Sequence, residues 1–147
     1  MAIKESQTSS NPKIDDERAK QIEEVVRRAE EKRGYSPPWL RFMGEIDLEF
    51  LETYNALYEL NGSRSVHLSL KVKELITVAA LAVERQDSGN RTHIRRALRL
   101  GATKEEIVEA LQAASFHTGA LTLVYGVNSL RAVLEELESE KKETSNE

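Results

Sequence analysis

Length, composition and charge limit what this chain of 147 residues can do. It is long enough for one moderate hydrophobic core, and its net charge of −4 argues against non-specific binding to nucleic acid, which needs an excess of Lys and Arg. It has no cysteine, which excludes disulfides, thiolate nucleophiles, iron–sulfur ligation and thiolate zinc sites. With no signal peptide and no apolar run of roughly 18 residues, we expect a cytoplasmic protein that does not enter a membrane.

The residue pattern predicts one all-α domain over residues 14–138. A polar N-terminal tail (1–13) and a charged C-terminal tail (139–147) lack apolar periodicity and are expected to fray. Apolar residues at helical spacing, with glycines and prolines as stop signals, define six helices. These helices are expected at about 15–33, 45–60, 70–84, 88–100, 103–117 and after Gly119.

Three of the predicted helices carry a distinctive pattern. The helix at 70–84 is apolar on nearly every side, so we expect it to be buried all round. Thr103 and Glu106 form a capping box at the start of the fifth helix. The last helix has leucines and valines at alternating spacings of four and three, which predicts packing against a helix of this chain or of another.

Glu74 and His93 are the strongest candidates for proton-transfer chemistry. Spacings of four residues put Glu74 on the face of Val78 and His93 on the face of Ala97, so both side chains are predicted to face inward. A buried carboxylate that hydrogen-bonds an imidazole orients the ring and raises its basicity, as in a general-base pair. The alternatives are a first-turn Glu that points outward and a core histidine with a structural role.

His117 and the arginines around His93 are candidates for substrate binding. His117 shares its face with small alanines and is predicted to line the same pocket as His93. The alternative is a packing histidine at a helix end. Guanidinium groups such as those of Arg91 and Arg95 bind carboxylates with two hydrogen bonds. The alternative is a solvated helix face paired with glutamates of this chain or of another subunit. The group comprises Arg85, Arg91, Arg95, Arg96 and Arg99.

Metal and phosphate chemistry are not indicated. No two of the three histidines are spaced three or four residues apart, which is the spacing that two ligands on one helix need. Glycine-rich phosphate loops and a Gly-x-Ser-x-Gly nucleophile elbow are absent from the sequence. We therefore predict no metal site and no cofactor.

Residues 70–124 combine several motifs in a fixed order. They are Lys-Glu-Leu-Ile at 73–76, His-Ile-Arg-Arg-Ala at 93–97, Gly-Ala-Thr-Lys-Glu-Glu-Ile-Val-Glu-Ala-Leu at 101–111 and a glycine at 119. This combination resembles the carboxymuconolactone decarboxylase family, which includes the alkylhydroperoxidase D-type proteins. The resemblance implies an all-α, six-helix bundle that assembles as a homotrimer or a hexamer. It also implies an active site among these helices, near a subunit boundary.

The peroxidase branch of that family carries Cys-x-x-Cys-x-x-x-His, with a Glu twelve residues before the first Cys. Counted back from His93, the resemblance places the two Cys positions at Gln86 and Gly89 and the Glu position at Glu74. The redox pair is therefore missing while the acid–base residues remain. Without a thiolate, peroxidase chemistry by the family's route is excluded.

The decarboxylase branch lacks the Cys pair and keeps the helix-borne histidine, as this chain does. It typically has Tyr-x-Gly-x-Pro where this chain has residues 117–121, and a Glu-Leu pair where this chain has Asn90 and Arg91. These departures leave the lactone substrate unspecified, although they keep the general class.

The resemblance leaves two functions open. The first is a cofactor-independent lyase, isomerase or hydrolase acting on a small carboxylate or lactone. In this function His93 moves the proton and Glu74 orients the imidazole ring of His93. His117 lines the pocket, and Arg91 or Arg95 holds the carboxylate of the substrate. The alternative is a non-catalytic helical oligomer, a ligand sensor or a subunit of another complex. An antioxidant role would require thiols from a partner.

Overall fold

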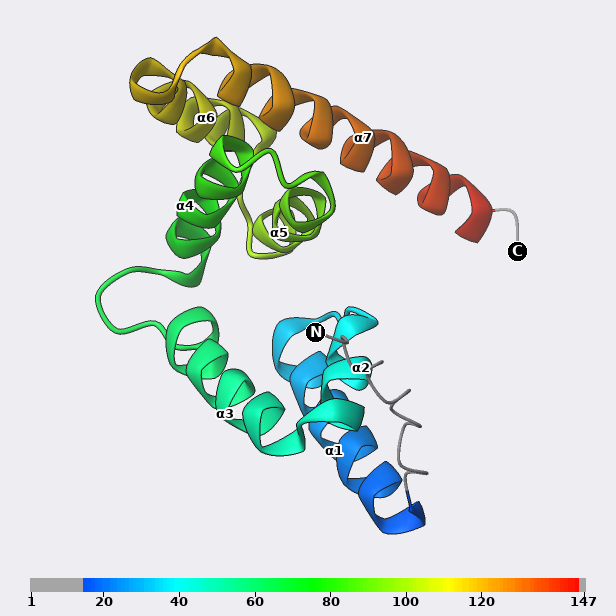
Figure 1. Cartoon of the computed structure of the whole chain (residues 1–147). Helices are drawn as coiled ribbons and strands as arrows, with labels where there is room; N and C mark the ends of the chain where they lie inside the picture. Colours follow the sequence, from blue (N-terminus) through cyan, green and yellow to red (C-terminus); the bar gives the residue numbers. More distant parts are fainter. Residues whose placement is uncertain (1–14, 146–147) are drawn as a thin grey trace, which may run out of the picture. The chain divides into compact units, whose positions relative to one another are not determined.

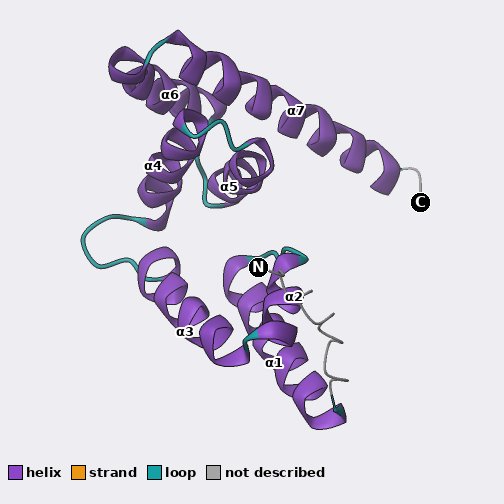
Figure 2. Ribbon diagram, in the orientation of Figure 1, coloured by secondary structure: helices purple, strands orange, loops and turns teal. Residues whose placement is uncertain are grey.

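The computed structural model describes residues 15–145, and all regular secondary structure in that part of the chain is helical (Figures 1 and 2). The all-α prediction is therefore confirmed. Residues 15–145 form seven α-helices and a short π-helix at Glu59–Ser63, one α-helix more than the six predicted. No helix in this range is long and apolar enough to cross a membrane.

The chain divides into two compact units, one up to Asn61 and one from Gly62 onward. The single domain expected over residues 14–138 stays a prediction. The expected tail at 1–13 lies outside the described residues. The charged tail expected at 139–147 is helical as far as Thr144, where the last helix ends, and its fraying stays a prediction. Glutamates and lysines favour the helix there, although the apolar stripe has ended.

The first unit contains three helices, α1 (Asp16–Arg33), α2 (Trp39–Ile46) and α3 (Leu48–Tyr58). Helix α1 agrees with its prediction, because Asp15 accepts a hydrogen bond from the Arg18 amide at its start and Gly34 adopts a φ of 77° at its end. The core of this unit comprises Ile22, Val25, Val26, Ala29, Leu40 and Leu51.

Helix α2 and the start of α3 differ from the prediction of one helix over 45–60. Asp47 has extended backbone, donates its amide to the Met43 carbonyl at the end of α2, and accepts from the Phe50 amide at the start of α3. One aspartate thus ends one helix and caps the next. The prolines before Trp39 indicated a loop, although Pro is also well tolerated at a helix start.

Four helices form the second unit: α4 (Leu70–Val83), α5 (Asp87–Arg99), α6 (Lys104–Thr118) and α7 (Ala120–Thr144). Both hydrogen bonds of the predicted capping box between Thr103 and Glu106 are present. Gly101 and Gly119 have positive φ and separate the helices. The core comprises Val78, Ala82, Ile94, Ala97, Ala102, Ile107, Leu111, Leu130 and Val133.

The prediction that the helix at 70–84 is buried all round is wrong for this chain. Helix α4 buries Glu74, Val78 and Ala82 on one face, whereas Ile76 on another face is 55% exposed. Val72 and Val83 are exposed as well. A uniformly apolar helix indicates that every face meets something apolar, but the pattern does not tell whether that surface comes from the same chain.

Candidate active site

Glu74 lies in the interior of the second unit. Ser69 caps α4 by accepting a hydrogen bond from the Val72 amide, and the helix then turns Glu74 toward α5, on the face of Val78. Its side chain is only 3% exposed. The alternative of a first-turn Glu that points outward is therefore wrong.

His93 meets Glu74 directly. Its Nδ1 atom lies 2.7 Å from Glu74 Oε2, and its side chain is 14% exposed, so the imidazole is more open than the carboxylate beneath it. An ionised carboxylate only accepts hydrogen bonds, so the hydrogen of this bond is assigned to Nδ1. The proton-accepting atom of the neutral ring is then Nε2. This is the arrangement expected of an oriented general base.

Arg96 is a third member of this group, and the sequence did not single it out. Its Nη1 atom lies 3.1 Å from the other carboxylate oxygen of Glu74, and its Nη2 atom donates to the Gly62 carbonyl at 2.8 Å. Arg96 is buried. From the sequence it is one of five arginines around the His93 helix, with no separate role. The signal that was available is its spacing of three residues from His93, which puts both side chains on one face of α5.

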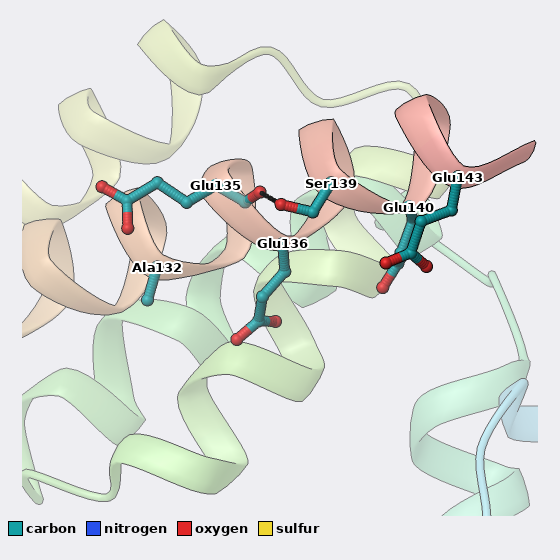
Figure 3. A pocket seen from close by; sticks show the side chains of 6 residues that line it. All are labelled: Ala132, Glu135, Glu136, Ser139, Glu140 and Glu143. Carbon is teal, nitrogen blue, oxygen red and sulfur yellow. Dashed lines mark hydrogen bonds between the residues drawn. The ribbon is translucent and has the colours of Figure 1, made fainter. Parts of the chain in front are cut away.

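Arg91 and Arg95 lie on another side of α5, against α7. Arg91 forms an ion pair with Glu136, and Arg95 Nη2 lies 2.6 Å from Glu136 and 2.9 Å from Glu140. Figure 3 shows Glu136 and Glu140 projecting from α7. Both arginines are therefore paired with glutamates of α7, as the alternative to substrate binding predicts.

Two shallow pockets adjoin these ion pairs. One of about 280 Å³ is lined by Asp87, Ser88, Arg91, Thr92, Arg95 and Glu136, and it places the two guanidinium groups beside two carboxylates. The other, of about 410 Å³ (Figure 3), is lined by Ala132, Glu135, Glu136, Ser139, Glu140 and Glu143. Four glutamates make the second pocket electrostatically unfavourable for a carboxylate ligand.

The remaining predicted positions are spread over α5 and α6. His117 is exposed near the end of α6, and its ring meets Phe116 edge to face. Gln86 precedes α5 and is exposed, and Gly89 lies in its first turn. A Cβ atom at Gly89 would lie 3.6 Å from Leu81, an ordinary contact. The assignments of these residues to the site stay predictions.

Asn90 lies near the start of α5. It is buried, and its Nδ2 atom donates to the Val78 carbonyl at 3.3 Å, linking α5 to α4 one turn before His93. Its Oδ1 atom is buried without a hydrogen-bond partner among residues 15–145. In the same range, no group of three His, Asp or Glu residues is arranged to hold a metal ion.

Comparison with known proteins identifies a family and a fold for this chain. A model of the carboxymuconolactone decarboxylase family matches residues 49–132, more than half of the chain. A crystal structure named "putative carboxymuconolactone decarboxylase from Burkholderia xenovorans LB400" has a TM-score of 0.70 and 20% identity, covering 84% of this chain and 98% of that one. At this identity the likeness shows the fold alone. No curated protein matches the chain.

Proposed function

The chain belongs to the carboxymuconolactone decarboxylase family, and on that premise we propose that it is a cofactor-independent lyase acting on a small carboxylate or lactone. His93 transfers the proton, and Glu74 orients the imidazole ring of His93. The observation that carries the proposal is the 2.7 Å hydrogen bond between a buried carboxylate and a partly exposed imidazole. A lone histidine would lack the partner that fixes the ring.

The proposed chemistry needs a proton donor and acceptor at one place. When a carboxylate leaves as carbon dioxide, the electron pair of the broken bond flows into a conjugated lactone or carbonyl, and a proton then ends the reaction at carbon. Nε2 of His93 is the atom proposed to deliver that proton. Glu74 stabilises the imidazolium whenever His93 holds a second proton.

Substrate binding is proposed for Arg91, Arg95 and His117 with a condition that follows from the structure. Both arginines already pair with Glu136, so a substrate carboxylate must replace an existing ion pair. We expect the exchange to gain little free energy, because the two ion pairs are chemically alike. His117 contributes an exposed ring that meets Phe116 edge to face at the end of α6.

A homotrimer or a hexamer is proposed for the assembly, as the family implies. Exposed apolar side chains on α4, among them Val72, Ile76 and Val83, support it, because such a surface is usually covered by protein. Sedimentation should give a multiple of three chains. A stable monomer at micromolar concentration would contradict this assembly.

The first test is a substrate screen of muconolactone-like lactones and β-keto acids. We expect turnover that falls by about 10²- to 10⁴-fold in His93→Ala, since that is the usual contribution of a general acid or base. The matched control is His67→Ala, which removes an exposed loop histidine and should keep the activity. Turnover that survives His93→Ala would remove His93 from the mechanism.

A non-catalytic role remains the second candidate, because the two arginines expected to hold a substrate are already paired with glutamates. A variant with Gln86→Cys and Gly89→Cys separates the two functions without a known substrate. A Cβ atom at Gly89 would make only ordinary contacts. If Glu74 and His93 are a competent proton relay, the variant should reduce an alkyl hydroperoxide to the alcohol and water with dithiothreitol as reductant, and His93→Ala should abolish this. A folded, inactive variant would favour the non-catalytic role.

A further inference from the structure

Two side chains of α5 share the carboxylate of Glu74. Its Oε2 atom lies 2.7 Å from His93 Nδ1, and its Oε1 atom lies 3.1 Å from Arg96 Nη1. His93 and Arg96 are three residues apart, so they stand on one face of the helix. Each oxygen of the carboxylate therefore has its own partner.

Burial makes the second partner important. A carboxylate in the protein interior loses its hydration, and without a compensating cation it becomes neutral by taking up a proton. A protonated carboxyl can donate a hydrogen bond to Nδ1, which would reverse the direction of the bond and move the ring hydrogen to Nε2. Nε2 would then no longer accept a proton.

We propose that Arg96 is a positioning residue for the proton transfer. Its guanidinium group keeps Glu74 an anionic acceptor, so that His93 carries its hydrogen on Nδ1 and exchanges protons with substrate through Nε2. The hydrogen bond from Arg96 Nη2 to the Gly62 carbonyl fixes the orientation of the guanidinium group. Arg96 acts through Glu74 and does not touch the substrate. The inference rests on the proposed function.

The neighbouring arginines do not have this position. Arg91 and Arg95 pair with Glu136 of α7, and Arg99 is exposed at the end of α5. Among the arginines predicted around His93, Arg96 is the one that is buried and the one that lies against Glu74. Arg99 therefore provides a matched control on the same helix.

The test is nitrogen NMR of the imidazole in the full-length chain labelled with ¹⁵N-histidine, at about pH 8, where an ordinary imidazole is neutral. The signals of His93 are assigned by their loss in His93→Ala. We expect a protonated-type shift for Nδ1 and an unprotonated-type shift for Nε2. In Arg96→Met the two shifts should move toward each other as the tautomers mix. Arg96→Lys should restore the original pattern, and Arg99→Met should not change it.

Unchanged nitrogen shifts of His93 in Arg96→Met would overturn the inference. If that variant does not fold, Arg96→Gln replaces it with the same expectation, because its amide is also neutral. These spectra need no substrate, so they remain decisive even if the substrate screen fails. With an active substrate, Arg96→Met should lower kcat by roughly 10- to 1000-fold and leave KM within about threefold. A change in KM alone would assign Arg96 to substrate binding and contradict the positioning role.

Discussion

Each of the two compact units buries one arginine, and the two arginines are accommodated in different ways. In the first unit, Arg33 donates to the Asn55 side-chain oxygen and lies 3.9 Å from the ring centre of Tyr58. Burial lowers the pKa of Arg33 from its ordinary value. In the second unit, Arg96 faces the carboxylate of Glu74 at 3.1 Å.

The difference shows which buried charge is coupled to another ionisable group. Around Arg33 the partners are the Asn55 amide and the rings of Tyr54 and Tyr58, which stabilise a cation without carrying a full negative charge. Arg33 Nε and Asn55 Nδ2 are also buried without hydrogen-bond partners among the described residues. Arg96 compensates a carboxylate that in turn binds His93. The first arrangement supports structure, and the second links charge to a titratable ring.

The largest expected effect is the loss of the cation in the second unit. Arg96→Met removes the ion pair of the buried Glu74, which must then stay uncompensated or take up a proton, and we expect the free energy of unfolding to fall by about 3–5 kcal/mol. Arg33→Met leaves the buried side-chain oxygen of Asn55 without its hydrogen bond, which costs about 1–3 kcal/mol. Urea unfolding of both variants measures the difference. Equal losses would mean that the carboxylate of Glu74 adds no extra cost when Arg96 is removed.

A double substitution controls for lost packing. Glu74→Gln combined with Arg96→Met removes both charges, so it should destabilise the protein less than Arg96→Met alone. A double variant that is less stable than Arg96→Met would show that an uncompensated charge on Glu74 is not the cause of the loss, because Gln keeps the methylene groups of Glu.

The next effect compares close helix packing in the two units. A Cβ atom at Gly126 of α7 would overlap Cδ2 of buried Leu111 and lie 2.7 Å from its Cδ1 atom, so Gly126→Ala should cost about 1–3 kcal/mol. At Gly44 of α2 the nearest atoms, from Ile22 and Leu51, lie at 3.1 Å. There the gain in helix propensity, about 1 kcal/mol, offsets the crowding, and Gly44→Ala should be close to neutral.

Thermal or urea unfolding of the two glycine variants decides this comparison. Leu111→Ala in the Gly126→Ala background provides the matched control, because it removes the atoms that clash. The cost of Gly126→Ala should then be smaller than in the otherwise native chain. An undiminished cost would show that backbone effects, rather than Leu111, make Gly126 necessary.

Helical periodicity predicted most of the fold and the central pair of the candidate site. It brought Glu74 and His93 to inward faces of two neighbouring helices, because one helix face is fixed by spacing alone. It did not separate Arg96 from four other arginines. That distinction depends on which side of α5 packs against α4 and which packs against α7, and these are properties of the tertiary structure.

Two errors in the helix prediction have different causes. Asp47 has the same identity whether it lies inside a helix or caps one, so the break between α2 and α3 has a weak signal. The exposed side of α4, with Ile76, has a strong signal instead. Its apolar residues indicate burial, but a single sequence does not specify the surface that buries them. The substrate could not be predicted from the sequence either, because no residue pattern identifies it.

The smallest expected effect concerns acid stability. A hydrogen bond from Lys71 and a second from the Thr103 amide lower the pKa of Glu106 in the second unit, and a hydrogen bond from Arg27 lowers the pKa of Glu24 in the first. A lowered pKa in the folded state gives stability that is complete above the ordinary value of 4.5 and is lost as the pH falls through the lowered value.

Glu106→Gln should therefore flatten the decline of stability in acid more than Glu24→Gln does. Glu106 closes a capping box at the start of α6, whereas Glu24 belongs to an exposed ion pair within α1. Thermal unfolding of both variants and the native chain from about pH 3 to pH 6 measures the slopes. Equal slopes would mean that the start of α6 depends on Thr103 and on packing, and that the carboxylate of Glu106 adds no more than a surface charge.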